Sequence, residues 1–215
     1  IVVLVGGTSG QYRLDVETAR RLGERLLELA RTSGGSLLIS VSRRTGAAAA
    51  DVLEAALGEE HYFYRWSPGG GDNPYLAYLA LADAFVITAD SESMIVEACS
   101  TTRPVYIWPL PVRLSWKWLR FNREWIVTLG SSYRSGVRSR IPGMKAIGRA
   151  CSWLQEQGYV RPARDLALMH EDLVARGMAR HFGAPFEVDR VMESVDDVAK
   201  VVRRVHELMG EAPAE

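Results

Sequence analysis

A chain of 215 residues with 47% apolar and 24% charged residues can bury one sizeable core and is too apolar for a disordered protein. Its 26 Lys and Arg balance its 26 Asp and Glu, so the net charge does not indicate a nucleic acid as partner. Two cysteines are too few for a disulfide framework or a cysteine metal site, and no apolar run reaches the roughly 18 residues of a membrane span. We therefore expect a cytoplasmic protein, and its four histidines show no metal spacing.

The first half of the chain alternates short apolar runs with helical patterns. Strands are expected at residues 1–5, 37–41, 61–64, 84–88 and 105–108. Helices are expected at residues 14–31, 47–57, 74–81 and 93–101. This alternation predicts βαβ units, and hence an α/β, Rossmann-like parallel sheet with helices on both faces. Ligands of such sheets bind beyond the carboxyl ends of the strands.

Past residue 109 the pattern changes. Residues 112–165 are rich in Trp and Arg, with helical stretches at 116–127 and 145–157, and we expect an insertion within one domain spanning 1–215. A C-terminal helix is expected at about 194–209. Its start has the Ser194 and Asp197 spacing of a capping box. Its apolar stripe consists of Val195, Val198, Val202, Val205 and Met209.

The loop after the first strand has the sequence Gly-Gly-Thr-Ser-Gly at residues 6–10. Glycines let the backbone approach a ligand, and N–H groups at a helix N-terminus favour an anion, so the loop is a candidate phosphate site. The alternative is an ordinary turn in which glycine serves only backbone geometry. Short-chain dehydrogenases have a glycine where Tyr12 stands, and no Tyr here has the Lys four residues later that they need. Gln11 replaces the last glycine of the Gly-x-Ser-x-Gly hydrolase turn.

The second strand is followed by Ser42-Arg43-Arg44-Thr45. Two guanidinium groups at a carboxyl strand end suit phosphate or carboxylate recognition. The alternative is a solvated basic turn in which Thr45 caps the next helix.

A third polar cluster follows the fourth strand. Ser93 and Glu97 are four residues apart and so share one face of the predicted helix. A carboxylate there can accept hydrogen bonds from two neighbouring sugar hydroxyls. Asp90 and Glu92 could instead bind a divalent cation, although two carboxylates without a third ligand are weak support. N-capping is the other role open to Asp90, Ser91 and Ser93, whereas Glu97 lies too far into the helix.

Two further segments leave alternatives open. The Gly-rich residues 69–75 are either a lid over the site or a linker. Residues 113–149 carry nine Lys or Arg against one acid, whereas residues 59–97 carry seven acids against one base. The basic segment is either a surface for an anionic membrane or a protein partner, or a solvated basic helix with buried Trp.

The motifs in combination resemble a known family. They are Gly6-Gly7-Thr8-Ser9-Gly10, Ser40-x-Ser42-Arg43-Arg44-Thr45, Asn73-Pro74-Tyr75 with Leu79-Ala80-x-Ala82-Asp83, and Thr88-x-Asp90-Ser91-x-Ser93-Met94-x-x-Glu97-Ala98 with Arg103-Pro104-Val105. The chain resembles the mitochondrial fission "elongated mitochondria" family and its bacterial relatives, a family regarded as glycosyltransferase-like with the two-domain GT-B architecture. The resemblance covers residues 1–111 and about 166–209, including a weaker match at residues 170–182. Residues 112–165 are longer than the family pattern.

The resemblance implies a domain that binds a nucleotide-sugar such as a UDP-sugar. In GT-B enzymes the C-terminal domain holds the donor, with a glycine loop for the phosphates and a helix glutamate, here Glu97, for the ribose. The nucleotide and phosphate residues implied are Gly6, Gly7, Thr8, Ser9, Gly10, Arg43, Arg44, Ser91, Ser93 and Met94. No metal or other cofactor is expected. The N-terminal domain, which brings the acceptor and the catalytic base, is expected to be missing before Ile1, so that the chain alone would be inactive.

A non-catalytic interaction protein is the alternative function. Plant members of the family are linked to recruiting a dynamin-like GTPase in organelle division. Residues 113–149 would then be the surface for a protein partner or for peripheral attachment to a membrane.

Overall fold

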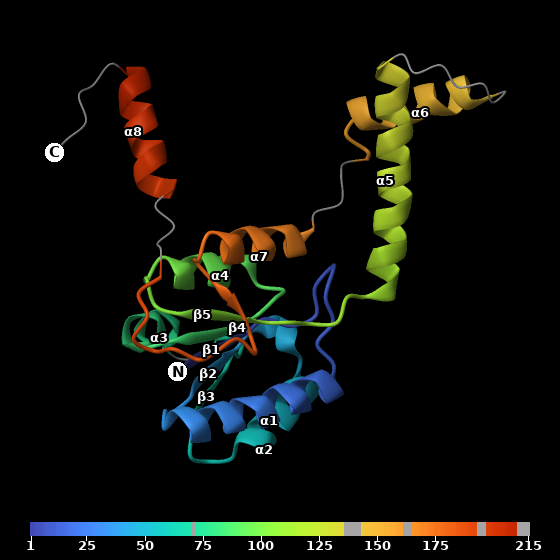
Figure 1. Cartoon of the computed structure of the whole chain (residues 1–215). Coiled ribbons are helices and arrows are strands. Elements are labelled where there is room, and N and C mark those ends of the chain that lie inside the picture. Colours follow the sequence, from blue (N-terminus) through green and yellow to red (C-terminus); the bar gives the residue numbers. More distant parts are fainter. Residues whose placement is uncertain (70–71, 136–142, 161–164, 193–196, 210–215) are drawn as a thin grey trace. The chain divides into compact units, whose positions relative to one another are not determined.

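The computed structural model describes residues 1–69, 72–135, 143–160, 165–192 and 197–209, with the side chains of 197–200 left out (Figure 1). The chain divides into two compact units. The first comprises Ile1–Pro111 with Leu166–Glu215, and the second is Val112–Asp165.

The first unit is built on a six-stranded sheet in the order β3-β2-β1-β4-β5-β6, and every pairing is parallel. Its strands are β1 (Val2–Val5), β2 (Leu38–Val41), β3 (Tyr62–Arg65), β4 (Phe85–Thr88), β5 (Val105–Trp108) and β6 (Arg180–His181). All residues of β1, β4 and β5 are buried, as expected of central parallel strands covered on both faces. The predicted α/β class with a Rossmann-like sheet is confirmed.

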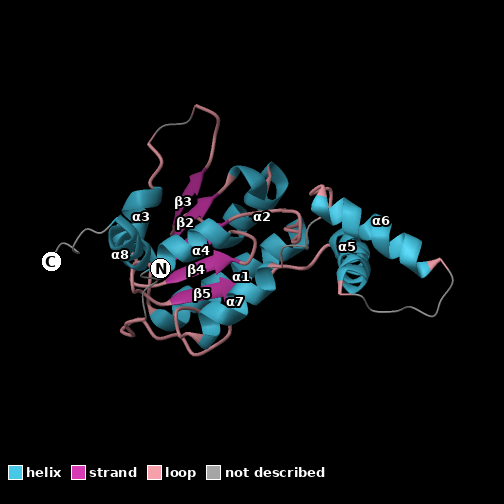
Figure 2. Ribbon diagram, turned by 90° about the horizontal axis from the view of Figure 1, so that it is seen from above, coloured by secondary structure: helices cyan, strands magenta, loops and turns pink. Residues whose placement is uncertain are grey.

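The helices of this unit are α1 (Val16–Ser33), α2 (Ala47–Leu57), α3 (Tyr75–Leu81), α4 (Glu92–Cys99), α7 (Leu166–Ala175) and α8 (Asp197–Met209), with a 3-10 turn η1 (Arg43–Thr45). Figure 1 shows α1 and α2 on one face of the sheet and α4 and α7 on the other, and Figure 2 shows the same layers from above. Crossovers to both faces are what βαβ units on either side of a central strand require.

Helix α1 illustrates how the sequence sets these elements. Asp15 caps its start by accepting a hydrogen bond from the Thr18 amide, and Gly34 ends it in the left-handed conformation. Its apolar face is buried against the sheet and α2. A Cβ on Gly23 would lie 2.7 Å from the Cβ of Ala56 in α2, so glycine permits the close packing of these two helices.

Some expectations differ from the structure. Gly46, not Thr45, is the N-cap residue of α2. Strand β6 and helix α7 were not expected, because β6 has only two residues and the apolar residues of α7 are spread around its whole circumference. The C-terminal helix is present, but Ser194 and Val195 of its predicted start lie outside the described residues.

The second unit contains two long helices, α5 (Leu114–Arg134) and α6 (Met144–Glu156). They pack closely where a Cβ on Gly130 would lie 2.9 Å from the Ser152 amide nitrogen. Helix α5 extends well beyond the predicted stretch 116–127. None of the helices in the described part of the chain has both the length and the apolarity needed to cross a bilayer.

Candidate functional site

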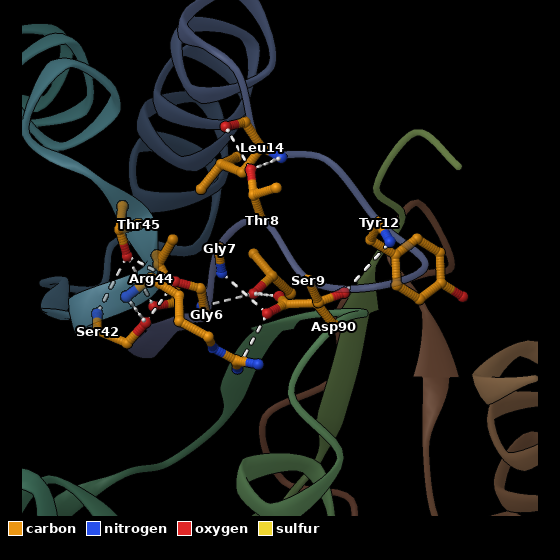
Figure 3. A network of polar contacts seen from close by, with 12 residues as sticks. Gly6, Gly7, Thr8, Ser9, Tyr12, Leu14, Ser42, Arg44, Thr45 and Asp90 are labelled. Atoms are coloured by element: carbon orange, nitrogen blue, oxygen red, sulfur yellow. Dashed lines mark hydrogen bonds and ion pairs between the residues drawn. The ribbon is translucent and has the colours of Figure 1, made fainter. Parts of the chain in front are cut away.

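The candidate site lies at the carboxyl ends of β1 and β4. Strand β1 pairs with β2 on one side and with β4 on the other. The chain runs from β1 outward through β2 and β3 and then returns to β4 on the other side of β1, so the strand order reverses there. Ligands of open α/β sheets bind at such a switch point. The loop after β1 and the loop after β4 meet there (Figure 3).

Asp90 joins the two loops. Its side chain is 0% exposed, and its Oδ2 accepts a 2.9 Å hydrogen bond from the Gly7 amide and pairs with the Arg44 guanidinium at 3.1 Å. Its Oδ1 accepts a 2.8 Å hydrogen bond from the Thr88 hydroxyl. The oxygen of that hydroxyl in turn accepts a 2.8 Å hydrogen bond from the Gly6 amide. Both oxygens of the carboxylate are therefore bound by groups of the protein (Figure 3). This is not the N-capping role considered from the sequence.

Burial raises the pKa of Asp90 above its ordinary value of 3.8, because desolvation disfavours the charged carboxylate. The Thr88 hydroxyl, the Arg44 charge and the Gly7 amide lower the pKa and offset part of this effect. The balance makes the folded chain bind the Asp90 proton more tightly than the unfolded chain does.

The amides of the glycine loop are already hydrogen-bonded within the chain. Gly6 and Gly7 donate to Thr88 and Asp90, as described above. The Thr8 amide donates to the Arg44 carbonyl at 3.2 Å, and the Ser9 amide to the Tyr12 carbonyl at 3.0 Å. These four amides are thus not free to bind a phosphate in this conformation. The N-terminus of α1 also has its own anion, the Asp15 carboxylate.

The glycines of the loop meet different constraints. A Cβ on Gly6 would lie 2.2 Å from an Asp90 carboxylate oxygen. Gly7 has a φ of 153°, and its Cβ would lie 2.0 Å from the Arg44 carbonyl oxygen. A Cβ on Gly10 would meet nothing within 4 Å. Gly6 and Gly7 are therefore required by the approach of neighbouring protein groups, whatever ligand binds.

The turn η1 holds the second strand's loop against the first. The hydroxyls of Ser42 and Thr45 both donate to the Gly6 carbonyl, and Ser42 also caps η1. Arg44 points to Asp90, whereas the Arg43 guanidinium lies 5.9 Å from the centroid of the Trp66 ring. The two adjacent arginines thus have separate surroundings.

Helix α4 presents the other predicted residues. Ser93 and Glu97 are exposed, Met94 is half-buried, and Ser91 is the buried N-cap residue without a side-chain capping bond. The Glu97 carboxylate accepts a 2.6 Å hydrogen bond from the Tyr75 hydroxyl.

Tyr75 is the first residue of α3 and ends the Gly-rich segment 69–75. Burial and the bond to Glu97 raise its pKa well above the ordinary 10, so Tyr75 remains a hydrogen-bond donor. Residues 70–71 of the segment lie outside the described residues, so its role as lid or linker stays untested.

A small cavity of about 180 Å³ opens at the carboxyl ends of β2 and β3. Arg43, Arg65 and Trp66 line it together with the start of α2. Trp66 was not among the predicted site residues, although its place immediately after a strand was a signal. The described residues contain no group of three His, Cys, Asp or Glu side chains that could hold a metal ion.

Comparison with known proteins places the chain in a family. The family model "Mitochondrial fission ELM1" matches residues 1–126, more than half of the chain. The chain belongs to the mitochondrial fission ELM1 family. Mitochondrial fission protein ELM1 of Arabidopsis thaliana is 41% identical over 107 residues, which are 50% of this chain and 25% of the plant protein. The match thus spans only a quarter of that ELM1 protein. No solved structure matches the chain.

Proposed function

We propose that this member of the ELM1 family binds the nucleoside diphosphate of a nucleotide-sugar along the carboxyl edge of its sheet, as the donor-binding part of a glycosyltransferase-like protein. The exposed Glu97 carboxylate carries the proposal. It lies on α4, the helix that follows switch-point strand β4, where nucleotide ligands of such sheets bind. The Tyr75 hydroxyl holds the carboxylate in place and leaves its other lone pairs for ribose hydroxyls.

The acceptor and the groups that react belong, in this proposal, to parts of the family's longer proteins outside the matched segment. The matched segment is only 25% of the plant relative. We accordingly expect the chain to bind the nucleotide and to transfer no sugar by itself.

The test is Glu97→Gln, which keeps shape and helix propensity but removes the charged acceptor. Charge-assisted hydrogen bonds contribute about 1.5–3 kcal/mol, so the affinity for UDP or the preferred nucleoside diphosphate should fall about tenfold or more. A 2′-deoxynucleotide should bind the wild type more weakly and the variant with little further loss. Calorimetric titration of both proteins with both ligands measures this coupling.

Glu92→Gln is the matched control, because it removes a carboxylate at the start of the same helix. Equal affinities of wild type and Glu97→Gln for both nucleotides would contradict the assignment of Glu97 to the ribose.

The aromatic face of α5 favours a second function, attachment to an anionic membrane surface. Leu114, Trp118, Phe121 and Trp125 recur at intervals of four, three and four residues, so they share one face of the helix, and each is more than half exposed. We call these four residues the α5 stripe. Arg113 and Lys117 neighbour the stripe, and exposed aromatic side chains with basic neighbours are typical of helices that lie in a membrane interface.

A further inference from the structure

Three arginines lie at or near the cavity of β2 and β3, and two of them are neutralised by the protein itself. Arg44 pairs with the buried Asp90 at 3.1 Å. Arg65 pairs with Asp51 at 2.6 Å and with Glu54, both on α2. Arg43 has no acidic partner among the described residues. In the part of the chain that the structure describes, Arg43 is therefore the arginine of this cavity whose guanidinium is not paired with a carboxylate.

Trp66 gives this charge a defined position. The guanidinium carbon of Arg43 lies 5.9 Å from the centre of the Trp66 ring, within the range of a cation–π contact. Both side chains line the cavity of about 180 Å³. A guanidinium held on an aromatic face loses less conformational freedom when it binds an anion than a free one does.

The backbone around the cavity also suits an anion. No side chain caps the first turn of α2, and that turn contains no acidic residue. Helix α1 differs, since Asp15 caps it and Glu17 lies in its first turn. The first amides of α2 thus add donors and a partial positive charge to the cavity that Arg43 lines.

We propose that the phosphate groups of the ligand bind in this cavity, to Arg43 and the first amides of α2, and not to the glycine loop. This inference rests on the proposed nucleotide binding. Asp90 takes the place of an anion at the glycine loop, as the Gly7 amide and Arg44 both bind it. Strands β2 and β4 flank β1, so their carboxyl ends are about 10 Å apart. Ribose near β4 and phosphates near β2 would then belong to one ligand.

The experiment titrates the full chain and its variants with inorganic pyrophosphate and with UDP, at constant ionic strength. Arg43→Gln should weaken pyrophosphate binding about tenfold, since it removes a charged donor. Trp66→Leu should weaken it less, because it releases Arg43 without removing it. Arg31→Gln, which removes one exposed arginine of α1, should leave the affinity unchanged.

Ala47→Glu adds a carboxylate to the first turn of α2, where it stabilises the helix. This variant should melt at the same temperature as the wild type or higher and should still lose pyrophosphate binding, which separates loss of the site from loss of the fold. Arg43→Gln and Ala47→Glu proteins that bind pyrophosphate like the wild type would overturn the inference. So would an equal loss in Arg31→Gln.

The UDP titration separates the inference from the proposed function. If Glu97→Gln weakens UDP binding and Arg43→Gln does not, the nucleotide site stands and the phosphate assignment is overturned. If pyrophosphate binding depends on Arg43 and UDP binds no better than pyrophosphate, the cavity stands as a phosphate site and the proposed recognition of the nucleoside is overturned.

Discussion

At the scale of single residues, Asp90 organises the carboxyl edge of the sheet. Its carboxylate accepts hydrogen bonds from the Gly7 amide and from the hydroxyl of Thr88, the last residue of β4. It also pairs with the Arg44 guanidinium of η1. A buried carboxylate with three such partners fixes the loops relative to one another, and removing any partner would leave part of its desolvation uncompensated.

The raised pKa of Asp90 predicts a pH dependence. Its contribution to stability is fully present below the ordinary carboxyl pKa of 3.8 and is lost as the pH rises through the higher pKa of the folded state. Asp90→Asn has no proton to lose there. The melting temperature of this variant should therefore rise relative to that of the wild type as the pH rises above about 4. A difference between the two proteins that stays constant over this range would show that Asp90 titrates like an ordinary carboxyl group.

The glycine loop provides a matched pair of substitutions. Gly7→Ala places a Cβ 2.0 Å from the Arg44 carbonyl oxygen at a φ of 153°, so it should cost about 1–3 kcal/mol of unfolding free energy. Gly10→Ala meets no atom within 4 Å and should stay within about 0.5 kcal/mol of the wild type. Urea denaturation of the three proteins measures both values. Equal stabilities of the two variants would mean that the loop does not approach Arg44 as described.

The contacts of these residues could be predicted from the sequence only in part. Glycines after a buried strand indicate a tight βα turn, but the connection between β1 and α1 is a longer loop that spans residues 6–15. The contact of Gly7 with Asp90 joins residues 83 positions apart, so no local pattern predicts that Asp90 points inward. Tyr75 and Glu97 were both singled out from motifs, but their hydrogen bond across 22 positions depends on how α3 and α4 pack.

At the scale of elements, the apolar pattern predicted those strands and helices whose apolar residues form a run or share one face, and it missed α7, whose apolar residues are spread around the helix. Four central strands and the helices between them have their expected places, because each strand is a mostly apolar run and each helix has a start or stop signal. The two-residue β6 contains Arg180 and His181 and joins the sheet through pairing with β5 alone. Its sequence has no strand pattern to detect.

The α5 stripe leads to a prediction about membranes. Trp118→Ser combined with Trp125→Ser should weaken binding to vesicles of anionic lipid by tenfold or more, since a buried large apolar side chain contributes about 1.5–3 kcal/mol. Binding of the wild type should weaken as salt rises, because the screening length falls to about 8 Å at physiological ionic strength. Vesicle co-sedimentation measures both effects.

Trp153→Ser is the control for this experiment. Trp153 is also half-exposed but lies on α6 and contacts Tyr159, so its loss should leave vesicle binding unchanged. A wild-type protein that does not bind anionic vesicles even at low salt would contradict a membrane role for the stripe.

At the scale of the whole molecule, one parallel sheet with a switch point at β1 and β4 brings the loops of four strands to one edge. Glu97 with its partner Tyr75, the buried Asp90 and Arg43 all belong to this edge. The arrangement differs from a glycine-loop phosphate site, because four backbone amides of the glycine loop are hydrogen-bonded within the chain. The groups that we propose for the phosphates lie instead around the cavity at the carboxyl ends of β2 and β3.

Binding of a nucleoside diphosphate by the whole chain decides whether the carboxyl edge of the sheet is a nucleotide site. Calorimetric titration with UDP, GDP and ADP, each compared with its nucleoside, measures what the diphosphate adds. We predict that at least one diphosphate binds at least tenfold more tightly than its nucleoside, since charge-assisted bonds to the phosphates add about 1.5–3 kcal/mol. If none of the three diphosphates binds, or if each binds no better than its nucleoside, the carboxyl edge of this sheet is not a nucleotide site.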